Sequence, residues 1–296
     1  SVGRASTAWP GGGLTSLSDS TDFLAAMAAA SMRRARSLRQ DPDSAGLAEA
    51  ASSLPPPPRL ALSPKGFDLI AEIKMTSPSA GVLSADSDAI ETRAGVYAGA
   101  GAAAVSVLTE PSRFGGSLSH LRRAAAVLGP LGIPAMAKDF IVDPIQIYAC
   151  RAAGAGGILL IVRILEDDLL ANLLALAGRL GMFTLLEAFD ETDLDRAAAV
   201  LEDHDPVEQL LLGLNCRDLQ TLAIEPARFS ALAHRFPSGY PKVAESGMTA
   251  AEDVRSAAQL GYGLSLVGTA LMRDEDPSGL LRDMLAAGRG AAGEMA

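Results

Sequence analysis

The sequence has few of the residue types that mark disulfide-rich or membrane-spanning proteins. Its two cysteines, Cys150 and Cys216, show neither metal-ligand spacing nor a disulfide framework, which is typical of a protein from a reducing cytoplasm. No apolar run reaches about 18 residues, so we expect no transmembrane helix. Arginines follow the apolar segment 23–32 instead of preceding it, which is the wrong order for a signal peptide. We therefore expect a cytoplasmic protein.

Histidine and net positive charge are also scarce. His120, His204 and His234 fall in predicted helices or surface connections, so the sequence predicts neither a metal site nor a Ser-His-Asp set. The net charge of −10 argues against nucleic acid and anionic membranes as partners, because both favour basic patches. A small anionic substrate stays compatible with this charge, since a few local cations can focus the field in a cleft.

The length of 296 residues fits one α/β barrel domain, which typically needs about 250 residues. Residues 1–21 are rich in Gly, Ser and Thr, and we expect them to be disordered or a cloning remnant. Residues 22–66 are predicted to form an N-terminal helical extension, with helices near 22–40 and 43–52 and an extended proline run at 55–58. This arm is placed to cap one end of the domain at 67–296. We expect a monomer.

A strand-then-helix alternation repeats eight times from residue 68 onward, which is typical of parallel β/α architecture. The expected strands are 68–74, 103–109, 134–140, 157–162, 183–189, 210–217, 242–247 and 264–270. The expected helices are 88–98, 118–128, 144–153, 168–180, 192–202, 226–236, 250–260 and 278–287. The eight units are similar in length, and the sequence contains no G-x-G-x-x-G motif. Both features favour a closed (β/α)₈ TIM barrel over the alternative, an open doubly wound sheet.

The segment at 68–79, DLIAEIKMTSPS, places two charges at the end of the first apolar strand. Residues two apart on a strand point to the same face, so Glu72 and Lys74 share one face. A buried carboxylate and ammonium are costly unless they pair with each other or act on a ligand. A structural ion pair and a catalytic pair both fit this segment.

The same pattern recurs at the ends of later strands, where the active site of such a barrel lies. The charged and polar residues there are Lys138 with Asp139, Glu187, Asn215, Arg217, Glu245 and Ser246. Any one of them could close a layer of the barrel by a salt bridge. Together they offer acid, base and anion recognition on one rim, which favours a catalytic site.

Glycines follow the last two strands at Gly247 and Gly268, and Thr269 comes next. Glycine lets the backbone approach a ligand, and a phosphate commonly binds here in barrels, so we expect these residues to bind phosphate. Cys216 has the opposite parity to its neighbours and is predicted to face the helices. Ser117, after Gly115 and Gly116, is predicted to cap the next helix.

At these motifs the chain resembles the indole-3-glycerol-phosphate synthase family. The resemblance rests on IAEIK at 70–74 with SPS at 77–79, VSVLTE at 105–110, KDFIVDP at 138–144, ILLIV at 158–162, LE at 186–187, NCRDL at 215–219, ESG at 245–247 and VGTALMR at 267–273. It implies a (β/α)₈ barrel with an N-terminal helical extension. It also implies closure of the indole ring of 1-(2-carboxyphenylamino)-1-deoxyribulose 5-phosphate, with loss of CO₂ and water and without a cofactor or metal.

The resemblance also implies roles for individual residues. Lys138 matches the general acid, Glu187 a second acid/base, and Lys74, held by Glu72, a group for proton transfer and for binding the substrate and its phosphate. Asn215 matches the group that positions the substrate's hydroxyls. The implied substrate contacts are Ser77, Pro78, Phe114, Phe140, Leu159, Arg217 and Ser246, with Glu245 at the ring-closure site and Gly247, Gly268 and Thr269 as the phosphate cradle.

Four positions depart from the family pattern. Met75, Ala80 and Ala137 stand where many members carry Arg or Lys, and Phe189 where His is frequent. We expect these changes to thin the positive charge around the rim.

Two other functions fit a barrel of this kind. Another phosphosugar barrel enzyme, such as phosphoribosylanthranilate isomerase, should carry an acid/base pair built on Asp or Cys. A catalytically silent barrel that binds a partner should have lost at least one charged rim residue, and the sequence retains them all.

Overall fold

The computed structural model describes residues 20–79, 81–83, 89–202, 209–218 and 221–295. The tail expected over 1–21 lies outside these residues except where it begins helix α1 (Ser20–Gln40). Within the described residues, no helix is both long enough and apolar enough to cross a membrane.

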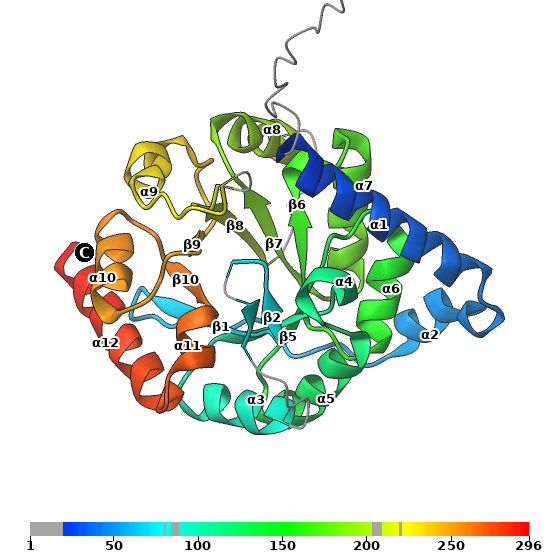
Figure 1. Cartoon of the computed structure of the whole chain (residues 1–296), viewed down its shortest axis with the longest axis horizontal. Helices are drawn as coiled ribbons and strands as arrows, with labels where there is room; N and C mark the ends of the chain where they lie inside the picture. The colour runs from blue at the N-terminus through cyan, green and yellow to red at the C-terminus, as the bar shows by residue number, and fades with distance from the viewer. Residues whose placement is uncertain (1–19, 80, 84–88, 203–208, 219–220, 296) are drawn as a thin grey trace, which may run out of the picture.

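Eight parallel strands close into a barrel in the order β1-β10-β9-β8-β7-β6-β5-β4 (Figure 1). Their bounds are β1 (Asp68–Ile73), β4 (Ala104–Leu108), β5 (Ala135–Lys138), β6 (Gly157–Ile161), β7 (Phe183–Ala188), β8 (Leu210–Asn215), β9 (Lys242–Glu245) and β10 (Leu264–Val267). Strand β1 pairs with both β4 and β10, so Ile70 is flanked by Ala104 and Leu266. The predicted closed (β/α)₈ barrel is confirmed.

Helices lie around the barrel, where those before α12 connect successive barrel strands and α12 follows the last one (Figure 1). They are α3 (Ala89–Gly99), α5 (Leu118–Leu128), α6 (Pro144–Ala152), α7 (Asp167–Arg179), α8 (Glu191–Glu202), α9 (Ala227–Leu232), α10 (Ala251–Gln259) and α12 (Pro277–Met295). Local sequence explains their starts: Ser117 accepts a hydrogen bond from His120 N, as predicted, and Asp143 accepts one from Ile145 N with Pro144 at the first position.

The strands bury both faces, so the core has two parts. Alternate residues such as Ile70, Met136 and Phe183 fill the barrel interior. Residues of the other parity, such as Leu69 and Leu186, pack between the strands and the helices. Cys216 belongs to this outer part, which confirms its predicted direction.

The N-terminal arm consists of α1, a 3₁₀ turn η1 (Pro42–Ser44) and helix α2 (Leu47–Ser53). Helix α2 contacts α6, and Arg151 of α6 donates a hydrogen bond to the carbonyl oxygen of Pro55 in the proline run. Helix α1, dark blue in Figure 1, contacts α6.

The loops after the strands carry elements that the sequence did not predict. After β1, strands β2 (Thr76–Ser77) and β3 (Gly81–Val82) form a small antiparallel hairpin. Helix α4 (Pro111–Phe114) follows β4, and helix α11 (Thr269–Arg273) follows β10. The prediction that the last strand runs to residue 270 is therefore wrong, because Gly268 ends the extended segment and Thr269 begins a helix. Strands β8 and β9 likewise end before Arg217 and Ser246.

Candidate active site

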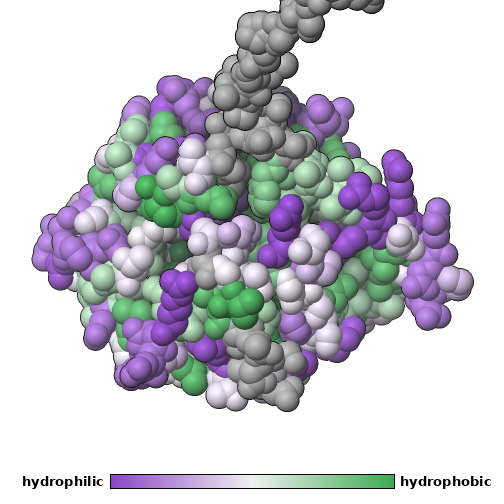
Figure 2. Space-filling view, viewed as in Figure 1, coloured by the Kyte–Doolittle hydropathy of each residue, from purple (hydrophilic) through white to green (hydrophobic). Residues whose placement is uncertain are grey.

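A cavity of about 660 Å³ opens at the carboxyl ends of the barrel strands. It is lined by nearly all the residues that the sequence predicts for the site: Glu72, Lys74, Ser77, Pro78, Phe114, Lys138, Phe140, Leu159, Glu187, Asn215, Arg217, Ser246, Gly247, Gly268 and Thr269. Viewed onto one face of the molecule, hydrophilic surface gathers over the outer helices, and paler or hydrophobic surface surrounds the centre (Figure 2).

Three side chains form a row of alternating charge on the cavity floor. Glu72 Oε1 lies 2.8 Å from Lys74 Nζ, and Glu72 Oε2 lies 3.2 Å from Lys138 Nζ. Only about a sixth or less of either lysine side chain is exposed, so both charges depend on Glu72 for compensation. The predicted pairing of Glu72 with Lys74 is present, and Lys138 joins it from the other side of the carboxylate.

These ion pairs fix the charge of the floor. Burial by itself would raise the pKa of Glu72, but Lys138 and Lys74 outweigh it and lower that pKa to about 2. Burial acts to lower the pKa of Lys138, yet Glu72, Glu245 and Glu187 together raise it above its ordinary value. At neutral pH the floor therefore presents two ammonium groups and a carboxylate.

Glu245 differs from the other predicted residues because it lies beneath the cavity lining and is fully buried. Its Oε2 atom lies 3.3 Å from Lys138 Nζ. Burial and the neighbouring Glu187 raise the pKa of Glu245 well above its ordinary value, although Lys138 opposes this shift. Glu245 therefore reaches the cavity only through its neighbours, which makes it a supporting group in this structure.

Strand β8 supplies the polar wall beside Glu187. Asn215 Nδ2 donates to Glu187 Oε2 at 3.2 Å, and Asn215 Oδ1 accepts from the backbone N–H of Arg217 at 3.0 Å. The Arg217 guanidinium donates to the Leu222 carbonyl oxygen at 2.9 Å, and burial lowers its pKa. The loop after β8 therefore holds Arg217 at the cavity wall.

Left-handed backbone shapes the loop after β9. Ser246 has φ of 70° and Gly247 has φ of 74°. A Cβ on Gly247 would approach Ile224 Cγ2 to 2.7 Å, so glycine is needed there both for conformation and for space. On the next loop, Gly268 directly precedes helix α11.

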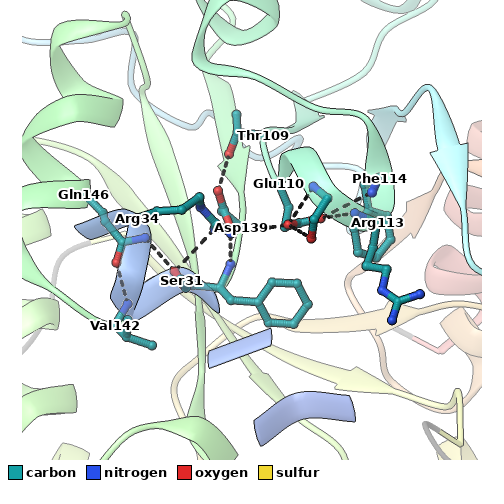
Figure 3. Close-up of polar contacts among 11 residues, drawn as sticks. Ser31, Arg34, Thr109, Glu110, Arg113, Phe114, Asp139, Val142 and Gln146 are labelled. Carbon is teal, nitrogen blue, oxygen red and sulfur yellow. Dashed lines mark hydrogen bonds and ion pairs between the residues drawn. The ribbon is translucent and has the colours of Figure 1, made fainter. Parts of the chain in front are cut away.

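A polar network ties helix α1 to two loops of the barrel (Figure 3). The Arg34 guanidinium lies 3.3 Å from Glu110 Oε1 and 2.5 Å from Asp139 Oδ1. Burial raises the pKa of Asp139, although the charge of Arg34 opposes this shift. Glu110 accepts hydrogen bonds from the backbone N–H groups that begin α4, ending at Phe114. Ser31 Oγ donates to the Phe140 carbonyl oxygen.

Aromatic contacts continue this connection into the cavity. The ring of Phe140 lies 6.4 Å from that of Phe23 on α1 and 6.4 Å from that of Phe114. Phe23 and Leu24 of α1 line the cavity, and the sequence motifs single out neither as a site residue. The sequence feature that could have identified Phe23 and Leu24 is their apolar character at the start of a predicted helix. Helix α1 therefore lies at the catalytic end of the barrel, whereas Pro57 and Pro58 of the same arm lie beside Gly181 and Gly156, which precede strands β7 and β6.

The expectation that the departures thin the rim charge is wrong for two of the four positions. Ala137 is fully buried between the sheet and the helices, because it has the opposite parity to Lys138, and Met75 is also buried in that outer core. Ala80 lies outside the described residues. Phe189 does line the cavity, where the Arg163 guanidinium lies 5.2 Å from its ring centre.

Histidines play no part in the described cavity lining. His120 lies in α5 and His234 in the turn η4 (Ala233–Arg235), while His204 lies outside the described residues. No group of three or more His, Cys, Asp and Glu side chains among the described residues is arranged to hold a metal ion.

A closed parallel barrel whose strand ends present paired ammonium and carboxylate groups in a cavity defines an enzyme of the (β/α)₈ barrel class. The family model described as indole-3-glycerol phosphate synthase matches residues 25–284. The chain belongs to this family.

Relatives support the same assignment. An indole-3-glycerol phosphate synthase of a Nocardioides species is 45% identical over 74% of this chain and 80% of its own length. That of Micrococcus luteus is 40% identical over 84% of this chain and 91% of its own length. Among solved structures, 3-hexulose-6-phosphate synthase of Salmonella typhimurium matches with a TM-score of 0.57 at 13% identity, covering 78% of this chain and 100% of the other, which shows the shared fold alone.

Proposed function

We propose that this chain catalyses the indole-3-glycerol-phosphate synthase reaction, closing the indole ring of 1-(2-carboxyphenylamino)-1-deoxyribulose 5-phosphate with loss of CO₂ and water. The observation that carries the proposal is the Lys74–Glu72–Lys138 row on the floor of a cavity in a chain of this family. Formation of indoleglycerol phosphate by the purified chain, followed by its absorbance, is the direct test.

The reaction needs an acid and a base at different places. The ring carbon that bears the carboxylate bonds to the substrate carbonyl carbon, the carbonyl oxygen takes a proton, and CO₂ leaves. That oxygen takes a second proton and departs as water, while a proton leaves the substrate's methylene carbon. We assign the acid role to Lys138 and the base role to Glu187, with Lys74 as a second proton donor oriented by Glu72.

The remaining cavity residues are assigned by chemistry and position. Arg217 and Ser77 offer a cation and a hydroxyl for the substrate carboxylate, and Asn215 offers an amide for its hydroxyl groups. Apolar side chains fit the flat aromatic ring: Phe114, Phe140, Leu159 and Pro78. Ser246, Gly247, Gly268, Thr269 and Lys74 are assigned to the phosphate and its surroundings.

The raised pKa of Lys138 bears on its role. A lysine that holds its proton strongly stays a cation and is a weak acid. An anionic substrate adds more negative charge, so proton transfer requires the accepting oxygen to become basic as the new C–C bond forms. Lys138 therefore acts first as a cation that polarises the carbonyl and later as an acid.

Neither rival function is favoured. The described cavity lining holds no cysteine, since Cys216 is buried on the helix side, and Asp139 in that lining is paired with Arg34. A catalytically silent barrel should have lost at least one charged rim residue, whereas every charged rim residue expected for catalysis is present.

We also propose that residues 22–66 act as a helical extension to the barrel domain at 67–296, in a cytoplasmic monomer. The cavity is lined by α1 and the barrel loops of a single chain, which supports a site that is complete in one copy. Analytical ultracentrifugation at the assay concentration tests the monomer: a stable dimer would contradict it.

A further inference from the structure

Gly213 lies within strand β8, where its backbone gives no reason for glycine. Glycines with a left-handed backbone are found at eleven other described positions, and Gly213 is not one of them. Glycine inside a strand weakens it, because the residue loses more entropy on folding and packs no side chain. The reason for glycine at 213 must therefore be the space that its missing side chain leaves.

That space is filled by the carboxyl group of Glu245. A Cβ on residue 213 would lie 2.1 Å from Glu245 Oε1 and 3.1 Å from Glu245 Cδ, and real Cβ contacts essentially never fall below 3.0 Å. Even alanine could not coexist with this position of Glu245. The carboxyl group is fully buried, so it has little freedom to move aside.

The strand register shows where this space leads. Glu245 on β9 pairs with Asn215, whereas Gly213 pairs with Glu187 on β7. The Glu245 side chain therefore bends over Gly213 of β8, the residue that lies between Glu245 and Glu187. Its other oxygen, Oε2, lies 3.3 Å from Lys138 Nζ.

We propose that Gly213 is a positioning residue for the ring-closure reaction: the space left by its missing side chain holds the carboxyl group of Glu245 between Glu187 and Lys138. The inference rests on the proposed function, and it adds a residue that does not touch the cavity.

The charge balance of the site depends on this placement. The groups that face Glu245 are Glu187 from β7, Lys138 from β5 and, beyond Lys138, Glu72 with Lys74. Burial and the neighbouring Glu187 raise the pKa of Glu245 while Lys138 lowers it, so the proton affinity of this carboxyl group depends on where it is held.

A second glycine is used in the same way on the other side of the floor. A Cβ on Gly268 would lie 2.4 Å from Glu72 Oε1 and 2.9 Å from Lys74 Nζ. The buried carboxyl groups of Glu245 and Glu72 therefore each occupy space that is left by a glycine, Gly213 within β8 and Gly268 directly after β10.

A double-mutant cycle tests the role of Gly213. Gly213→Ala is made in the native chain and in a Glu245→Ala variant, where the nearest remaining contact of the new Cβ is Leu185 Cδ1, the end of a flexible side chain, at 3.0 Å. We expect Gly213→Ala to lower kcat at least about 10-fold in the native chain and less than about 2-fold in the Glu245→Ala background. In the native background the pH profile of kcat should also shift, because Glu245 leaves its place beside Glu187 and Lys138. Gly178→Ala, on α7 with open space around it, is the matched control and should change neither.

Each other outcome decides the question. An equal loss in both backgrounds, or an unshifted pH profile with a lower kcat, would overturn the inference. If Gly213→Ala fails to fold, the variant that carries both Gly213→Ala and Glu245→Ala should fold. A double variant that also fails to fold would overturn the inference. If the native chain forms no indoleglycerol phosphate, the proposed function fails, and the same cycle read by thermal unfolding still tests whether Glu245 fills the space at Gly213.

Discussion

Lys138 Nζ lies 3.2 Å from Glu72 Oε2, and this contact joins the third strand of the barrel to the first. Glu72 is shared by two ammonium groups, because Lys74 binds its other oxygen. The pair therefore fixes both the position of the proposed acid and the charge of the floor on which the substrate rests.

Replacing Lys138 by alanine should lower kcat by at least about 10²-fold, the lower range for loss of a general acid. The fold should survive, since the strand itself is held by backbone hydrogen bonds and by the apolar core. Steady-state kinetics with a circular-dichroism spectrum measures both effects. Lys65→Ala, at an exposed position before β1, is the control and should match the native chain. Turnover of Lys138→Ala within a few-fold of native would remove Lys138 from the mechanism.

Glu72 should make stability depend on acid pH. Its pKa falls from an ordinary 4.5 to about 2 on folding, so its contribution is complete above 4.5 and is lost as the pH falls toward 2. A shift of this size corresponds to on the order of 3 kcal/mol. The free energy of unfolding, measured in urea between these pH values, should fall less steeply for Glu72→Gln than for the native chain. Equal slopes would show that Glu72 is not held by the two lysines.

Arg34→Ala should weaken both the fold and the active site. The substitution leaves the carboxylates of buried Glu110 and half-buried Asp139 without their shared cation, at a cost of about 2 kcal/mol for hydrogen bonds to charged groups. Because those residues hold Phe114 and Phe140, we expect KM to rise as well. Arg36→Ala, on the exposed side of the same helix, serves as the control. A variant with native KM and native unfolding free energy would contradict this role for the N-terminal helix.

Inorganic phosphate or sulfate should inhibit competitively by binding at Gly247 and the Gly268–Thr269 turn. Glycine leaves room for an anion to approach the backbone at these loops. Initial rates at several phosphate concentrations give the pattern. An unchanged KM at saturating phosphate would show that the phosphate cradle lies elsewhere.

Ala137→Arg should lower the melting temperature without strengthening substrate capture. The side chain faces the core between sheet and helices, where an unpaired charge is strongly destabilising. Differential scanning calorimetry and kcat/KM at low and high salt measure the two effects. A salt-sensitive gain in kcat/KM would mean that the side chain reaches the rim after all.

Local patterns in the amino-acid sequence are enough to predict the barrel and the polar residues at the ends of its strands, whereas the apolar contacts Phe114, Phe140 and Leu159 followed only from the family resemblance. Strand and helix periods are local properties, and parallel strands bring their carboxyl ends to one rim, so periodicity alone places Lys74, Lys138 and Glu187 together. Parity along one strand also places Cys216 correctly. The same rule predicts that Ala137, directly before Lys138, points to the other face of the strand. Its assignment to the rim therefore disagreed with its parity.

Tertiary packing alone determines which residues meet across long distances in the chain. Arg34 finds Glu110 and Asp139 because α1 lies over the barrel end, and nothing local to the helix specifies those partners. Gly213 matters because a carboxyl group from another strand fills the space beside it. Periodicity predicts which way a side chain points. The conformation of a buried side chain, and so the position of its end, follows from close packing against its neighbours. Those neighbours are in place only once the barrel has closed.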